Sequence, residues 1–408
     1  MIPPTGGGEL RFGGGLVATN LKKPVSIRPP KIDAGAAQTG LRILFVLFLL
    51  FIFLVGVKGL GDGFKMLGKD LLDSFFLATS NPFVGLMVGI LATTLVQSSS
   101  VTTAMIVGLV AAPEDPLPVV NAIPMIMGAN IGTTVTNSLV SMGHIGRPDE
   151  FRRAFSVATC HDFFNFMAVS VMLPIELFTG VLSKTAASIS TALMGTGGVE
   201  YHSPFKAALK TALGPVKDAA HFMFEDSSRA QAIVIVLFSV AAIFTALTFI
   251  VKTMRRLLAT RVEIALSRAF KMPAIVAMLL GALMTMAVQS SSITTSLLVP
   301  LAGAGVITLQ QAFPLTLGAN IGTTVTALLA SMAASGANAQ AGLTIALVHL
   351  LFNLSGTLLI YPFPPIRRIP LLMAEKLADF SVRRRRWAII YVLIVFFGLP
   401  ALFAFLNR

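Results

Sequence analysis

Charged residues are scarce in this chain. Only 12% of its 408 residues are Asp, Glu, Lys or Arg, whereas 55% are hydrophobic, and the mean hydropathy is +0.82. Soluble domains carry about 25% charged residues. The shortage of charge excludes an ordinary soluble domain, and the excess of apolar residues indicates a polytopic membrane protein.

Cysteine and several common motifs are also missing or nearly so. Cys160 is the one cysteine, so no disulfide can form within the chain. The one Asn-x-Ser/Thr sequence, at Asn353, falls inside an apolar stretch and is no plausible glycosylation site. The chain has no G-x-x-x-x-G-K-[ST] sequence, which disfavours transport driven by ATP, and no G-x-S-x-G sequence. The lack of disulfides and of glycosylation sites fits a bacterial inner membrane.

The apolar stretches predict an all-α fold. They begin at Leu41 and are long enough to cross a bilayer as helices. The expected helices cover residues 41–60, 83–112, 118–142, 154–182, 230–251, 273–303, 313–333, 341–361 and 387–406. Residues 1–40 are rich in Gly and Pro and lack an apolar run, so we expect a disordered tail rather than a cleavable signal peptide.

The net charge of +13 indicates topology rather than a nucleic-acid partner. Lys and Arg lie beside the apolar stretches, where the positive-inside rule places them in cytoplasmic loops. The segments expected on the cytoplasmic side hold 22 of the 31 basic residues and are residues 1–42, 143–153, 252–272 and 362–386. The segment 183–229 is then extracytoplasmic. This assignment requires that 83–112 and 273–303 are re-entrant hairpins, which return to the side of the membrane that they entered. If both crossed fully, the basic loops 143–153 and 252–272 would not lie on the same side as the N-terminus. Residues 204–221 have apolar residues at near-helical spacing and are expected on the outer membrane surface.

Two basic clusters beside the spans are interpreted in the same way. Arg152 and Arg153 stand where a helix starts on the cytoplasmic side, and topology explains them better than a role in guiding an anion. The run Arg383–Arg386 is expected to anchor the chain and to touch anionic lipid headgroups.

Three motifs occur twice in the same order. They are QSSS from Gln97 and Gln289, GANIGTTVT from Gly128 and Gly318, and HDFFN and HLLFN from His161 and His349, with the copies 192, 190 and 188 residues apart. Such regular spacing indicates two homologous halves, residues 83–182 and 273–361. One crossing helix, 230–251, separates them, so we expect inverted repeats, an architecture associated with alternating access.

The duplicated motifs bring hydroxyl and amide groups into apolar stretches. A single serine cluster there is most often explained by hydrogen bonds to its own helix or by tight helix packing. Duplication favours function instead, because helices broken at QSSS and GANIGTT expose N–H groups that suit an anion and carbonyl groups that suit a small cation. Neither motif contains Lys or Arg, and the acids well inside the repeat spans are Asp162 and Glu176. An oxyanion held there needs a mobile cation to balance its charge, which predicts a cation-coupled anion symporter.

The paired motifs resemble those of a known family. QSSSVTT, GANIGTTVTN and FRRAFSVATCHDFFN, with the second-half runs QSSSITTSLLVPLAGAGVITL, PLTLGANIGTTVTALLA and HLLFNLSGTLLIYPFP, are similar to the type II sodium-phosphate cotransporters. The similarity covers residues 41–406 except the loop 183–229, which is shorter than in the animal members and lacks their cysteines and glycosylation sites. We also expect one helix fewer near the C-terminus. The resemblance implies an importer of inorganic phosphate that is driven by sodium, uses no cofactor, and has QSSS hairpins that meet near the membrane midplane.

The resemblance also implies which residues bind the two ions. The expected sodium ligands of the second half are Gln289, Ser290, Thr323 and Thr326, and their mirror residues are Gln97, Ser98, Thr133 and Thr136. The residues expected to line the phosphate site are Ser99, Ser100, Ser291, Ser292, Asn130 and Asn320.

Asp162 has no mirror acid, because the matching position of the second half is Leu350. One interpretation is a structural hydrogen-bond partner, for example of His161. The other is a sodium ligand together with Asn165. In the family, an Asp at this position goes with electrogenic transport, so the resemblance implies that net positive charge moves inward in each cycle.

Transport is weighed against two other classes of function. A membrane enzyme with a serine nucleophile is disfavoured, because a nucleophile needs no inverted copy. A receptor that binds phosphate without moving it would need a signalling appendage, and none is visible in the tail or the loops. Within transport, another oxyanion such as arsenate and another coupling cation stay open.

Overall fold

The computed structural model describes residues 36–66, 77–113, 115–194, 204–269, 272–334 and 338–406, and every regular element in these ranges is helical. The elements are α1 Ala36–Met66, α3 Pro82–Val96, α4 Ser99–Val110, α5 Val119–Thr133, α6 Val135–Met142, α7 Pro148–Thr179, α8 Val181–Met194, α9 Pro204–Met223, α10 Ser228–Ala269, α11 Ala274–Val288, α12 Ser291–Gly303, α13 Leu309–Ser331, α14 Ala339–Ile360, α15 Pro364–Arg383, α16 Arg386–Val392, η1 Leu393–Gly398 and α17 Leu399–Leu406. The disordered tail expected for residues 1–40 lies outside the described residues, except that Ala36–Gly40 belong to α1.

Seven helices of the described chain are long and apolar enough to cross a membrane. They are Gly40–Phe64, Val119–Met142, Pro148–Thr179, Ser228–Met254, Leu309–Ser331, Ala339–Ile360 and Arg386–Phe403. The apolar helices α3, α4, α11 and α12 have only 12 to 15 residues. Because a span needs about 20 residues, none of these four is long enough to cross alone. They form two pairs, α3–α4 and α11–α12, and each pair is interrupted at QSSS.

The first short pair turns back on itself. α3 and α5 pack together and run in the same direction, because Gly85 and Gly89 of α3 approach successive turns of α5 in the same order. The start of α3 therefore lies beside the start of α5. α4 ends at the same place, where the Leu117 N–H donates to the Leu109 carbonyl at 3.1 Å. α11 and α13 of the second half pack in the same parallel sense.

The two GANIGTT motifs differ: the first copy contains the helix break that the sequence predicted, and the second does not. α5 ends at Thr133, and a turn at Thr134, within the first copy, separates it from α6, whereas α13 is continuous through the second copy. The first glycine of each motif permits close contact with a neighbouring helix. A Cβ added at Gly128 would lie 2.0 Å from the Leu86 carbonyl oxygen, and one at Gly318 would lie 1.9 Å from the Met278 carbonyl oxygen. Only glycine permits this approach of α5 to α3 and of α13 to α11.

Segments expected as loops also contain helices. α10 continues to Ala269 through most of 252–272, α15 fills most of 362–386, and 183–229 contains most of α8 and all of α9. Charged residues end the apolar stretches that predict membrane spans, but Leu, Ala and Arg favour helix. The helices therefore extend beyond the predicted spans. Arg152 of α7 forms an ion pair with Asp379 of α15, and the guanidinium holds the pKa of that carboxyl below its usual range by hydrogen bonding. Arg152 therefore has a structural role.

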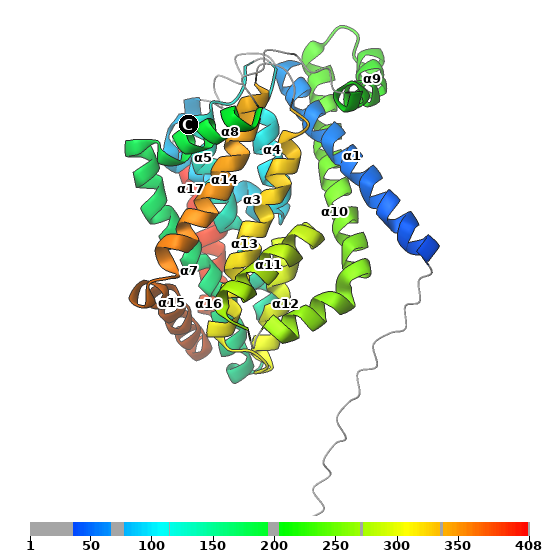
Figure 1. Cartoon of the computed structure of the whole chain (residues 1–408). Helices are drawn as coiled ribbons and strands as arrows, with labels where there is room; N and C mark the ends of the chain where they lie inside the picture. The colour runs from blue at the N-terminus through cyan, green and yellow to red at the C-terminus, as the bar shows by residue number, and fades with distance from the viewer. Residues whose placement is uncertain are drawn as a thin grey trace, which may run out of the picture.

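α1 and α10 lie side by side at one edge of the molecule, with α9 near their upper ends in the view of Figure 1. They are antiparallel, because Gly56 of α1 approaches Ile243 of α10 while Gly63 approaches Val236. α9 is the helix expected within 204–221. Leu209 and Leu213 are buried where α9 packs against the α1–α10 pair, whereas Phe222 and Met223 at its end are exposed.

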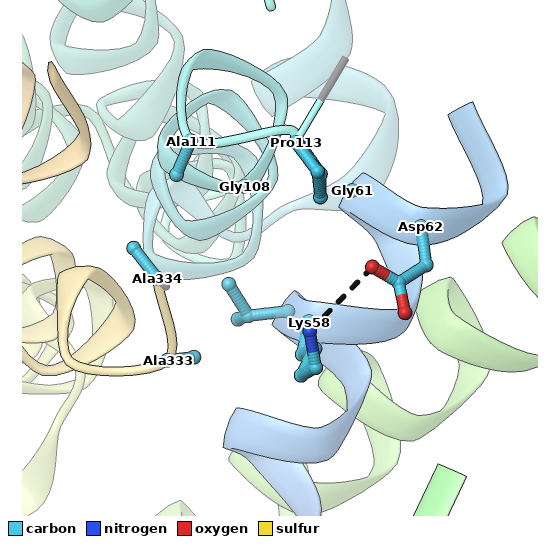
Figure 2. Close-up of a pocket in the computed structure, with 9 residues that line it drawn as sticks. Lys58, Gly61, Asp62, Gly108, Ala111, Pro113, Ala333 and Ala334 are labelled. Carbon is cyan, nitrogen blue, oxygen red and sulfur yellow. Dashed lines mark ion pairs between the residues drawn. The ribbon is translucent and has the colours of Figure 1, made fainter. Parts of the chain in front are cut away.

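An ion cluster fastens α9 to α1. Asp62 of α1 accepts a hydrogen bond from Lys217 of α9 at 2.7 Å and lies 3.5 Å from the Lys58 ammonium. Figure 2 shows Asp62 and Lys58 beside a small pocket that α1 forms with the end of α4 and with residues 333–334. Since Asp62 is already neutralised by two lysines, this cluster holds helix ends together.

The far end of each short pair is tied to the opposite half. At the end of α12, the Arg153 guanidinium of α7 donates to the carbonyls of Gly303 at 2.6 Å and Ala302 at 3.2 Å. At the end of α4, the Asn338 amide that precedes α14 donates to the Ala112 carbonyl at 2.6 Å. These bonds satisfy carbonyls that a helix end leaves free, and they interlock the two halves.

We expect Gly128→Ala to lower the free energy of unfolding by about 1–3 kcal/mol, which is what overpacking of a tight contact costs. The added methyl would collide with the Leu86 carbonyl of α3. Gly146→Ala is the matched control, because no heavy atom lies within 4 Å of a Cβ added there. Thermal unfolding in detergent compares the two variants, and a Gly128→Ala midpoint equal to that of the wild type would contradict this account of the motif.

Candidate functional site

The two QSSS segments adopt the same unusual backbone. Gln97 ends α3 with φ 56° and ψ 26°, and Gln289 ends α11 with φ 59° and ψ 27°. Among the other non-glycine residues that the structure describes, only Asp115 has a positive φ. Left-handed backbone is uncommon for a residue with a side chain, and such strain concentrates at functional sites. The duplication in sequence is therefore a duplication in geometry.

A new helix starts directly after each glutamine. Ser98 caps α4 by accepting a hydrogen bond from the Val101 N–H at 3.3 Å, and Ser290 caps α12 by accepting from the Ile293 N–H at 3.4 Å. The other N–H groups of each first turn point toward the break, where the helix dipole also favours negative charge. Each segment thus offers a helix start that can bind an anion without Lys or Arg.

Each glutamine carboxamide meets a threonine of its own half. The Thr136 hydroxyl donates to Gln97 Oε1 at 3.1 Å, and the Thr326 hydroxyl lies 3.0 Å from Gln289 Oε1. The second pair also contacts the first half, because Ser100 donates to the Gln289 backbone carbonyl at 3.4 Å and its hydroxyl lies 3.4 Å from that of Thr326. Oxygen atoms of both halves therefore gather around Gln289, and oxygen is the ligand that hard cations prefer.

Both helix breaks open into one cavity of about 370 Å³. The residues of the two QSSS segments that line it are Gln97, Ser98, Ser100, Gln289 and Ser290. α10 supplies a further part of the wall, between Phe244 and Lys252. Hydroxyl, carboxamide and backbone groups of both halves thus share a space of ligand size. The contribution of α10 was not expected from the sequence, because α10 carries none of the repeated motifs.

The remaining expected ion-binding residues differ in their contacts. Ser99 and Ser291 are buried in the first turns of α4 and α12. Ser292, which follows Ser291, is half-buried. Thr133 and Thr323 are buried, and each hydroxyl donates to the carbonyl four residues earlier, at 2.9 Å and 3.0 Å respectively. The hydroxyls of these two threonines are thus bonded to their own helices rather than to the glutamines.

Four asparagines form a buried network where the halves meet. Asn320 Nδ2 donates to Asn353 Oδ1 at 2.6 Å and to Asn165 Oδ1 at 3.1 Å. Asn165 Nδ2 donates to the Asn130 backbone carbonyl at 3.1 Å, and Asn353 Nδ2 lies 3.5 Å from Asn130 Oδ1. Each half contributes an equivalent pair. Asn353 was missed as a site residue, although its place in HLLFN, matching Asn165 in HDFFN, was the signal that could have found it.

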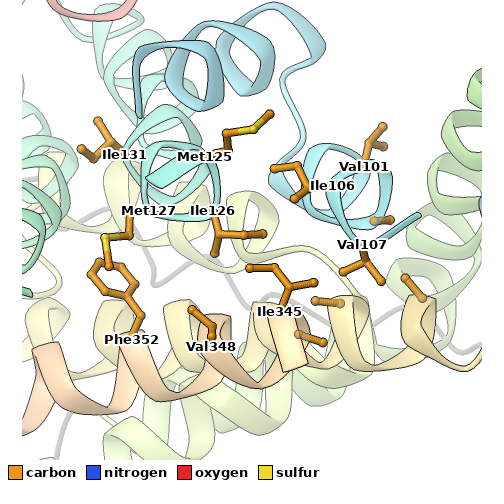
Figure 3. Close-up of a cluster of buried hydrophobic side chains, with 14 of the residues drawn as sticks. Val101, Ile106, Val107, Met125, Ile126, Met127, Ile131, Ile345, Val348 and Phe352 are labelled. Atoms are coloured by element: carbon orange, nitrogen blue, oxygen red, sulfur yellow. The ribbon is translucent and has the colours of Figure 1, made fainter. Parts of the chain in front are cut away.

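An apolar layer adjoins this network. In Figure 3, Ile126 and Met127 of α5 lie close to Val348 and Phe352 of α14, and Val107 of α4 lies in the same cluster. These side chains are buried. The network is therefore shielded on this side, which makes its hydrogen bonds stronger and the loss of any one of them costlier.

Asp162 is fully buried in α7. The Tyr391 hydroxyl donates to its Oδ2 at 2.8 Å, and the Thr134 and Ser138 hydroxyls lie near the carboxylate. Oδ1 and the Ser138 hydroxyl are buried, and neither has a partner in normal hydrogen-bond geometry among the described residues. A hydrogen bond to His161 is not formed, and Asn165 belongs to the asparagine network instead. An unpaired carboxylate oxygen at membrane depth is costly, and a bound cation would satisfy it.

Similarity to known proteins extends over both QSSS segments. The family model described as Na+/Pi-cotransporter matches residues 52–201 and 243–402, which include both QSSS breaks. The chain belongs to this family. Among curated relatives, the sodium-dependent phosphate transport protein 2A of Rattus norvegicus is 34% identical over 91% of this chain and 69% of its own length. The sodium-dependent phosphate transport protein 2B of Homo sapiens is 33% identical over 88% of this chain and 64% of its own length.

The chain thus spans about two thirds of the length of these Na+/Pi-cotransporter relatives. No solved structure shows significant similarity to it.

We expect Asn320→Ala to destabilise the protein by about 1–3 kcal/mol, because it leaves two buried carboxamide oxygens without their donor. Those oxygens belong to Asn165 and Asn353. Ser156→Ala is the control, since the Ser156 hydroxyl is buried but donates only to the carbonyl of Arg152 in its own helix. Equal unfolding midpoints for the two variants would show that the network does not hold the halves together.

Proposed function

We propose that this chain imports inorganic phosphate together with sodium ions by alternating access. Membership of the Na+/Pi-cotransporter family supports this pair of ions, as do the relatives named sodium-dependent phosphate transport proteins. These relatives are transporters rather than enzymes. The observation that carries the proposal is the single cavity into which both left-handed glutamines and both capping serines open.

The phosphate is proposed to lie between the two helix starts. The N-terminal turns of α4 and α12 direct N–H groups and positive dipole ends toward the breaks, and Ser99, Ser100, Ser291 and Ser292 add hydroxyls. Asn130 and Asn320 are engaged in the asparagine network, so their proposed role is to hold α5 and α13 in register beside the phosphate. Hydroxyl and amide donors fit a tetrahedral oxyanion, and arsenate would satisfy the same donors.

One sodium ion is proposed to bind at each glutamine. The Thr326 hydroxyl lies within hydrogen-bond distance of Gln289 Oε1 and of the Ser100 hydroxyl, and Ser100 also bonds the Gln289 backbone carbonyl. A cation placed among these groups would have several oxygen ligands. Gln97 and Thr136 repeat part of this arrangement. Ser290 and Ser98 adjoin these groups, whereas Thr323 and Thr133 would first have to release their bonds to their own helices.

A further sodium ion is proposed at Asp162. Its unpaired Oδ1 and the unpaired Ser138 hydroxyl support a cation site, and the absence of an acid at Leu350 makes that site unique to the first half. The support for Asn165 as a co-ligand is weaker, because it bonds to Asn130 and Asn320. One extra cation in one half only would make each transport cycle electrogenic.

The halves are proposed to be inverted repeats with re-entrant hairpins. In support, hydrogen bonds collect the helix ends into two groups. The first group contains the end of α4 and the start of α14, which the bond from Asn338 to Ala112 links. The second contains the start of α7 and the end of α12, which the bond from Arg153 to Gly303 links. The first group also includes the end of α1 at Asp62, through the pocket shared with the end of α4. The second group carries the basic residues, which supports its placement in the cytoplasm together with the N-terminus. Scarce cysteine supports a bacterial inner membrane.

We expect purified protein in proteoliposomes to take up radiolabelled phosphate when sodium is present and not when potassium replaces it. Gln289→Ala should reduce this uptake by roughly tenfold or more, because loss of a partner from a charged group costs about 1.5–3 kcal/mol. Ser290→Ala, which removes the cap of α12, should also reduce it.

Gln340→Ala is the matched control for these variants, since Gln340 is exposed and bonds Thr191 away from the cavity. Uptake that is indifferent to sodium would contradict sodium coupling. Binding of phosphate without uptake would favour a receptor instead.

We expect Asp162→Gly and Asp162→Asn to abolish the transport current while leaving some phosphate uptake, because both remove the charge that would hold the extra cation. Tyr391→Phe should keep the current, since it removes only the hydrogen bond to Oδ2 and retains the carboxylate. Currents recorded from protein-containing membranes test this. An unchanged current in Asp162→Gly would rule out Asp162 as the source of electrogenicity.

A further inference from the structure

One charged side chain stands in the wall of the cavity that the QSSS segments share. Lys252 of α10 lines it, and the described residues that line it include no Asp or Glu and no other Lys or Arg. The described part of the chain shows no ion pair for Lys252, whose ammonium lies 5.2 Å from the centroid of the Phe249 ring. The cavity therefore combines neutral hydrogen-bonding groups with a single positive charge.

A lysine near the end of a span often serves only as an anchor in the headgroup region. Lys252 lies just before the end of the candidate span Ser228–Met254, so this simpler role must be weighed. Two observations favour a role in the cavity. Lys252 lines the same space as both glutamines, and Thr248, one turn earlier on the same helix face, lines it too. A lysine that faces a cavity among membrane helices marks an ion pathway more often than a lipid-facing one does.

We propose that Lys252 and Thr248 form an additional phosphate-binding point on α10, outside the two QSSS segments. The ammonium supplies charge-assisted hydrogen bonds to a phosphate oxygen, and the Thr248 hydroxyl supplies one more donor. This inference rests on the proposed phosphate transport. The QSSS segments contain no Lys or Arg, so Lys252 supplies the fixed charge that attracts the anion into the cavity and keeps sodium at the oxygen ligands of the glutamines.

The course of α10 indicates where phosphate meets this point. α10 is antiparallel to α1, so Lys252 lies toward the end at which α1 begins. The proposed topology places that end in the cytoplasm, so the point holds phosphate as it leaves the QSSS segments. The test therefore requires reconstitution in both orientations, so that added phosphate reaches this face in part of the population.

The test is sodium-dependent phosphate uptake into proteoliposomes at saturating sodium, with phosphate varied at two ionic strengths set by choline chloride. Lys252→Gln should raise the half-saturating phosphate concentration roughly three- to tenfold, which is the effect of one partly solvated charge. The maximal rate should change less. Lys252→Arg keeps the charge and should stay near the wild type, and Thr248→Val should raise the half-saturating concentration by a smaller factor.

Lys210→Gln is the matched control, because Lys210 is an exposed lysine of α9 that does not line the cavity. Added salt should weaken phosphate uptake by the wild type more than by Lys252→Gln, since salt screens the charge that the variant lacks. The inference is overturned if Lys252→Gln matches Lys210→Gln in both constants and in salt dependence, or if Lys252→Arg is as impaired as Lys252→Gln. Wild-type protein without sodium-dependent uptake would instead contradict the proposed function itself.

Discussion

At the depth of a membrane no bulk water pairs with backbone groups, so a broken helix must find partners within the protein or in a ligand. The two QSSS segments are such breaks. Ser98 and Ser290 satisfy one N–H of each new helix, and Arg153 and Asn338 satisfy carbonyls at the far ends. The N–H groups that remain belong to the first turns of α4 and α12, which start beside the cavity that Ser98 and Ser290 line. This unfilled hydrogen-bonding capacity is what an anion can use.

The two breaks are alike in backbone but not in surroundings. The second glutamine contacts Ser100 of the first half, and no matching bond from Ser292 to Gln97 is present among the described residues. Asp162 likewise stands in one half only. Under the proposed alternating access, the repeated motifs would give two similar arrangements, and these differences would let the halves bind ions unequally. The glycine contacts at Gly128 and Gly318 join helices within each half, and the Asn network joins the two halves to each other.

The sequence predicted the helical class, the membrane spans and the repeated motifs, because these follow from apolar runs and from duplication. It did not predict that the second GANIGTT copy stays helical, since a glycine that permits helix contact and a glycine that breaks a helix look the same without the partner helix. Tyr391 was missed because its role depends on Asp162, which is far away in the chain, whereas the HLLFN motif did contain the signal for Asn353. From the sequence, Lys252 was interpreted as one of the basic residues that set the membrane topology. The face of α10 on which it lies is known only from the cavity that it lines.

The most direct test of the shared site is an experimental structure determined with sodium and phosphate present. The account predicts one phosphate between the starts of α4 and α12, contacted by Ser99 or Ser100 and by Ser291 or Ser292, with sodium beside Oε1 of Gln289. Phosphate bound at one break alone, or outside the cavity that both breaks share, would contradict the claim that the two halves build a single site.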